Sequence, residues 1–95
     1  MKLKKGDLVY ALNVRSFSGI TFECIEGFVV SLDCIKKTIT IRAKNIILLN
    51  TVTKGDETLF YLSLDVFKIY KDRSQVKSMR KTCLDLSLLL GEKPR

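Results

Sequence analysis

Basic side chains crowd the last third of the chain and are its strongest chemical signal. Lys77 lies three residues before Arg80 and four before Lys81, a spacing that puts these cations on one face of a helix. Ammonium and guanidinium groups bind phosphate oxygens and carboxylates. Asp72 is the one acidic residue between positions 71 and 81, so this segment is predicted to bind an anionic partner through Lys71, Arg73, Lys77, Arg80 and Lys81.

Two smaller groups could extend that surface. Lys36, Arg42 and Lys44 form the first, and alternation puts Arg42 and Lys44 on the outer face of a strand. Such a row could contact phosphate oxygens. Arg15 and Phe17 form the second, in a polar loop. An exposed Phe17 could stack on a nucleic-acid base, and the alternative is that its ring tucks over the end of the sheet.

The residue types needed for catalysis are mostly missing. The chain has no histidine, which excludes the commonest general base and the Ser–His and Cys–His pairs. No glycine-rich phosphate-binding motif occurs, and Cys24, Cys34 and Cys83 lack the spacing of a zinc site. We therefore expect no catalytic residue, no metal, no cofactor and no small-molecule substrate, and we predict that the protein is not an enzyme.

Glu26 is the one carboxylate whose position is unusual. It shares the parity of Phe22, Cys24 and Phe28, so a regular strand would point it into the core. An unpaired carboxylate is costly there. A bulge at Glu26 and Gly27 would turn the side chain outward, and a buried functional acid is the alternative.

Length and charge limit the class of protein. A chain of 95 residues has room for a single domain, predicted to span residues 1–95. The net charge of +7 favours an acidic partner. No apolar run is long enough for a membrane span, and an odd number of scattered cysteines is typical of a reducing compartment. We expect a cytoplasmic protein without membrane contact, as a monomer or weak homodimer.

The elements that must position these side chains are strands first and a helix last. Alternating apolar residues predict five short strands, at 8–14, 20–33, 38–44, 59–64 and 66–70, with a hairpin loop at 53–57. In the second strand the predicted inward residues include Phe22, Cys24, Phe28, Val30 and Leu32. Gly27, in the middle of that strand, indicates a sharp bend.

The pattern changes to a helical period near residue 72. Asp72 is a suitable N-cap and Gly91 a suitable C-terminal cap, which predicts a helix over about 72–90. One apolar stripe should hold the helix on the sheet, through Val76, Met79, Cys83, Leu86 and Leu90. Three further leucines lie outside this stripe: Leu84, Leu88 and Leu89. They could widen the buried face of the helix, and the alternative is that they form a surface for a dimer or a partner.

Residues 5–10 (Lys-Gly-Asp-Leu-Val-Tyr) and 25–30 (Ile-Glu-Gly-Phe-Val-Val) resemble the first two strands of SH3-like small barrels, including Tudor-like and KOW-type modules. Residues 37–42 resemble the third strand. The resemblance implies a mainly β fold: either a five-stranded small barrel over about 5–70 or a strongly bent antiparallel sheet, followed by the amphipathic helix and a short basic tail at 91–95.

Together these observations predict a non-catalytic nucleic-acid-binding module, with DNA or RNA held mainly through backbone phosphates and with weak sequence preference. The alternative is a protein-interaction or inhibitor module, of the kind found among phage and mobile-element accessory proteins, which docks an acidic protein through the same basic face. An uncovered sheet edge or the aromatic loop could also carry such a contact.

Overall fold

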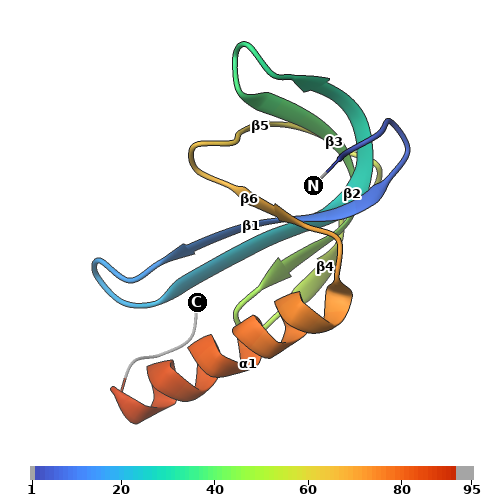
Figure 1. Ribbon diagram of the computed structural model, residues 1–95. Helices are drawn as coiled ribbons and strands as arrows, with labels where there is room; N and C mark the ends of the chain where they lie inside the picture. Colours follow the sequence, from blue (N-terminus) through green and yellow to red (C-terminus); the bar gives the residue numbers. More distant parts are fainter. Residues whose placement is uncertain (1, 92–95) are drawn as a thin grey trace.

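The computed structural model describes residues 2–91 and contains an antiparallel sheet followed by one helix (Figure 1). This confirms the predicted fold class. The predicted basic tail lies outside the described residues except for Gly91. The elements are β1 (Leu8–Arg15), β2 (Thr21–Asp33), β3 (Thr38–Leu48), β4 (Val52–Lys54), β5 (Leu59–Ser63), β6 (Lys68–Tyr70) and α1 (Arg73–Leu89).

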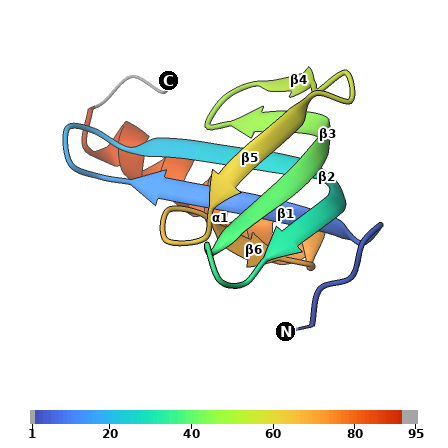
Figure 2. The ribbon, with the colours of Figure 1, turned by 90° about the horizontal axis from the view of Figure 1, so that it is seen from above.

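The sheet is bent and open. Its strand order is β4-β3-β2-β1-β6, and β5 pairs with the first half of β3 (Figure 2). No ladder joins β5 to β6 among residues 2–91, so of the two predicted forms the bent sheet is the one observed and the closed barrel is not. The structure has one strand more than the five predicted. The additional strand is β4, which forms where a loop at 53–57 was predicted because residues 52–54 pair with residues 45–47 of β3.

A bulge in β3 bends the sheet beside Gly27. Glu26 pairs with Asn45 whereas Gly27 pairs with Ala43, which leaves Lys44 as the extra residue. The backbones approach closely here, since a Cβ on Gly27 would lie only 2.9 Å from the carbonyl carbon of Arg42 and closer still to its oxygen. Glycine is therefore required at the bend that the sequence predicted.

Each face of the sheet carries its own core. The first core, on the concave side that β5 helps to enclose, is wholly apolar: Val9, Ala11, Ile25, Val29, Ile39, Ile41, Ala43 and Leu62. The second core lies between the sheet and α1: Tyr10, Leu12, Phe22, Cys24, Leu49 and Val76. Simple alternation failed beyond Gly27, where Val29 is buried and Leu32 is exposed, because a second bulge leaves Val30 of β2 as an extra residue.

The helix begins where the sequence predicted. The Asp72 carboxylate accepts hydrogen bonds from the backbone N–H and the hydroxyl of Ser74, at 2.9 and 2.7 Å. These bonds, the hydroxyl's being the larger cause, hold the pKa of Asp72 below its usual range. At the other end, Gly91 adopts a positive φ of 74° and its N–H donates to the Leu88 carbonyl.

The predicted apolar stripe is correct only in the first half of α1. Val76 is buried, and Met79 and Cys83 pack partly against the second core. Leu86 and Leu90 are exposed, whereas Ser87 is buried. The reason is geometric: Ser87 lies three turns after Val76 and within about 20° of its direction, whereas Leu86 points about 80° away.

The wider leucine face is not buried as a unit either. Leu84 packs partly against the second core, but Leu88 and Leu89 are 62% and 82% exposed. The last turns of α1 thus present apolar side chains to solvent. Within residues 2–91, no helix has the length and apolar character required to cross a membrane.

Candidate nucleic-acid interface

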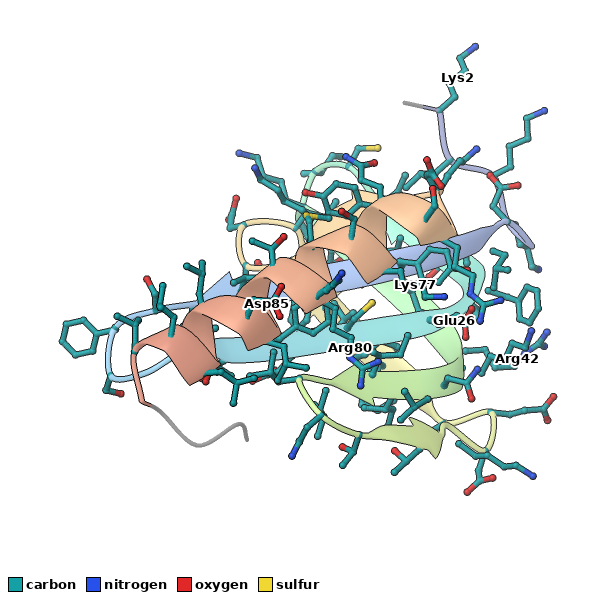
Figure 3. All side chains as sticks on the ribbon, turned by 90° about the horizontal axis from the view of Figure 1, so that it is seen from below. Lys2, Glu26, Arg42, Lys77, Arg80 and Asp85 are labelled. Atoms are coloured by element: carbon teal, nitrogen blue, oxygen red, sulfur yellow. The ribbon has the colours of Figure 1, made fainter. Side chains whose placement is uncertain are left out.

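The first half of α1 crosses the face of the sheet that carries Arg42, so two groups of cations far apart in sequence become neighbours. Arg73 and Lys77 line a cavity of about 150 Å³ together with Asn45 of β3. Figure 3 shows Lys77 of α1 and Arg42 of β3 on either side of Glu26, with Arg80 on the same side of the molecule. We call Arg42, Lys44, Arg73, Lys77 and Lys81, all exposed, the basic face.

The β3 part of this face is positioned by pairing and by the bulge. Arg42 pairs with Phe28 of β2, and its guanidinium carbon lies 5.6 Å from the centre of the Phe28 ring. That cation–π contact orients an otherwise flexible side chain. Lys44 is the extra residue of the bulge, and its side chain is exposed.

Arg80 has a different role from its helical neighbours. Its Nε donates to the carbonyl oxygens of Leu48 and Leu49, at 2.8 and 3.2 Å. The side chain is therefore turned toward the sheet and is only partly exposed. Arg80 fastens α1 to the end of β3, and Lys77 and Lys81 are left to face solvent.

Glu26 forms the floor of the cavity beneath the basic face. It is 6% exposed, and its Oε1 accepts a hydrogen bond from Nδ2 of Asn45 at 2.6 Å. The Tyr10 hydroxyl also donates to it. The expected outward turn at the bulge is wrong: the extra residue lies in β3, so β2 keeps its alternation and Glu26 stays inward.

Burial and the nearby carboxylate change the acidity of two neighbours. Desolvation, with the hydrogen bond to Glu26 as the next cause, raises the pKa of Tyr10 to about 12. Desolvation likewise raises the pKa of the Cys24 thiol to about 12. Both groups are thus neutral at physiological pH, and Tyr10 can serve as a permanent hydrogen-bond donor to Glu26.

Three predicted site residues lie away from the basic face. Arg15 forms an ion pair with Glu23 at 2.8 Å, on the β1–β2 hairpin. Phe17, at the tip of that hairpin, is fully exposed, so the expected tucking over the sheet end is not observed. Lys36 lies in the β2–β3 turn, where its N–H donates to the Asp33 carboxylate at 3.0 Å.

Lys71 also departs from the prediction, since its Nζ pairs with Asp7 at 3.2 Å. Of the five predicted C-terminal cations, the basic face therefore keeps three, Arg73, Lys77 and Lys81, whereas Lys71 pairs with Asp7 and Arg80 docks the helix. Sequence reasoning missed Tyr10 and Asn45 as partners of Glu26. The position of Glu26 on the inward parity of β2 indicated that it needed hydrogen-bond partners. Only the pairing of β2 with β1 and β3 identifies Tyr10 and Asn45 as those partners.

Comparison of the chain with protein-family models, with curated proteins and with solved structures finds no match.

Proposed function

We propose that the protein is a non-catalytic nucleic-acid-binding module that holds DNA or RNA through its basic face. The observation that carries the proposal is that Arg73 and Lys77 of α1 line one cavity with Asn45 of β3, and that Lys77 and Arg42 lie on either side of Glu26 (Figure 3). Helix α1 and strand β3 lie far apart in sequence, and each carries exposed cations without an ion-pair partner among residues 2–91. A bent, SH3-like sheet with a helix across one face is the framework of this proposal.

The chemistry of the face favours phosphate contacts over base readout. Of its five cations, none forms an ion pair within residues 2–91. Exposed lysines and arginines with no carboxylate partner are available to displace the counterions of a nucleic acid. Sequence preference should be weak, because phosphate contacts position a protein but carry no base information.

Glu26 lies beneath this interface, in the cavity that Arg73 and Lys77 also line. Its carboxylate lies below the surface and accepts hydrogen bonds from Asn45 and Tyr10. Asp56 and Glu57 form the nearest acidic loop along the chain from β4, where Glu57 N–H donates to the Ala43 carbonyl. We expect phosphates to bind on the α1 side of β3, away from that loop.

The test is charge reversal at three positions, Arg73→Glu, Lys77→Glu and Lys81→Glu. The matched control reverses three exposed lysines outside the face, Lys2→Glu, Lys5→Glu and Lys36→Glu, which changes the net charge by the same amount. Arg80 is left intact because its loss would loosen the helix. Affinity is measured by fluorescence anisotropy with a labelled 20-base-pair duplex and a 20-nucleotide RNA at 50 mM salt.

We expect the face variant to bind at least tenfold more weakly than the control, because it loses three phosphate contacts and gains three repulsive charges. Equal weakening in both variants would mean that net charge alone drives the binding. Failure of the unmodified chain to bind either nucleic acid would refute the proposed function.

A further inference from the structure

A second surface, on the other side of α1 from the basic face, has the form of a docking groove. Leu12 and Val14 of β1, Tyr70 of β6, and Met79 and Cys83 of α1 line a groove of about 460 Å³. Its lining is mainly apolar. Lys68 is its one charged residue among those the structure describes, and no carboxylate lines it.

The edge of β1 is uncovered along this groove. Strand β6 pairs only with Tyr10, Ala11 and Leu12, whereas β1 continues to Arg15. Figure 2 shows β1 extending past β6 toward the β1–β2 loop. An uncovered edge is a template for another strand.

The phase of the ladder identifies which backbone groups point outward. Val29 N–H donates to the Asp7 carbonyl at 2.9 Å, so the Asp7 carbonyl points to β2. Bonding sides alternate along an antiparallel strand, which directs the odd residues of β1 to β2 and the even ones to the opposite edge. Of the even residues, Val14 lies beyond Leu12, which is the last residue of β1 that pairs with β6.

The chain itself turns away before it could pair with Val14. In the register of β1 and β6, Val14 would face Val66. The N–H groups of Val66 and Phe67 instead donate to the Ser63 carbonyl, at 3.1 and 2.9 Å. Within residues 2–91, the N–H and C=O of Val14 therefore have no strand partner, and the Val14 and Val66 side chains are about half exposed.

We propose that this groove binds an extended acidic segment of a partner protein, which adds to the edge of β1 at Val14 in line with β6. Backbone bonds to Val14 would set the register, and alternate apolar side chains of the segment would pack on Met79 and Cys83. Lys68 lies opposite Leu12 and therefore on the groove side, where it would attract an acidic side chain at the end of the segment nearest β6. A net charge of +7 favours an acidic occupant and disfavours a second copy of this chain. This site is independent of the proposed nucleic-acid interface.

The probe is a capped seven-residue peptide that alternates glutamate and valine, titrated into the ¹⁵N-labelled full chain. One comparison peptide carries lysine in place of glutamate, and another carries N-methyl groups on the amides that would face β1. We expect shifts at Val14, Lys68 and Met79, at least tenfold slower hydrogen exchange at the Val14 amide, and at least tenfold weaker binding of both comparison peptides.

Val14→Pro removes the outward N–H without touching the ladder to β2, and Val14→Thr keeps it. We expect the proline variant to lose at least tenfold in peptide affinity and to keep its duplex binding, whereas the threonine variant should bind both. The N-methylated peptide tests the same bonds if the proline variant does not fold.

Three outcomes would overturn the proposal. The first is no binding of the glutamate peptide at millimolar concentration. The second is binding that the N-methyl groups leave unchanged or that shifts only the basic face. The third is a dimer of the chain through Val14, seen by analytical ultracentrifugation, which would make a second copy the occupant.

Discussion

The two faces of the sheet differ in what they bury. The concave face encloses the apolar cluster from Val9 to Leu62, and no charged residue among those described is buried there. The face under α1 buries Phe22 and Cys24 but also Glu26. One face therefore resembles an ordinary sheet core, and the other combines apolar packing with a hydrogen-bonded carboxylate and a rim of cations.

The difference indicates a division of roles. Apolar burial on the concave side contributes most of the free energy that holds the strands together. The face under α1 orients the helix, through Val76 and the Arg80 hydrogen bonds, and thereby places Lys77 on the same side of the molecule as Arg42 (Figure 3). Changes to the first core should affect the whole fold, whereas changes to the second should affect the helix and the basic face first.

The largest effect should come from Ile41→Ala in the first core. Ile41 is fully buried, and removing three carbons should lower the free energy of unfolding by about 2–5 kcal/mol. Urea denaturation followed by circular dichroism measures this loss. A loss below about 1 kcal/mol would contradict the assignment of the concave face as the main core.

A smaller and more local effect is expected from Val76→Ala. Val76 is 3% exposed at the contact of α1 with the sheet, and its truncation should cost about 2 kcal/mol. Hydrogen exchange should accelerate in α1 more than in β2 and β3. Uniform acceleration across helix and sheet would show that the two cores unfold as one unit.

Tyr10→Phe should cost about 1–2 kcal/mol, because Glu26 loses one of its two donors while staying buried. The pH dependence sharpens this prediction. The pKa of Tyr10 is raised from 10.0 to about 12 in the folded chain, so its contribution is complete below pH 10 and is lost as the pH rises to 12.

The free energy of unfolding, measured by urea denaturation from pH 9 to 12, should therefore fall less steeply in Tyr10→Phe than in the parent chain. Cys24, whose pKa is raised from 9.0 to about 12, supplies a similar decline in both. Parallel curves for the two proteins would mean that Tyr10 titrates normally and does not support Glu26.

The smallest effect is expected at the far end of α1. Leu89 is 82% exposed, so Leu89→Lys should change the free energy of unfolding by less than about 0.5 kcal/mol. Urea denaturation followed by circular dichroism checks it. A loss above 1 kcal/mol would show that the last turn is packed and that the comparison between the two halves of the helix is wrong.

Much of the fold could be predicted from local patterns. Alternation located the long strands, Asp72 and Gly91 bounded the helix, and Gly27 marked the bend. These features depend on neighbouring residues and on backbone geometry, which the sequence displays directly. The short strand β4 was not predicted, because residues 52–54 are extended only through their pairing with β3.

The candidate site was less predictable because it depends on tertiary pairing. The choice of strand for the bulge, β3 and not β2, decides whether Glu26 points in or out. Likewise, helical spacing grouped Arg80 with Lys77, but the Leu48 carbonyl that binds Arg80 lies 32 residues away. The convergence of Arg42 with α1 had no sequence signal, since it follows from how the helix crosses the sheet.

The salt dependence of duplex binding tests the central proposal most directly. Five phosphate contacts by the basic face predict that the logarithm of the association constant falls with the logarithm of salt concentration with a slope of about −4.5. The Arg73, Lys77 and Lys81 reversal should reduce that slope to about −2, while the matched control keeps it. A slope near zero, or the same slope in all three proteins, would contradict the account.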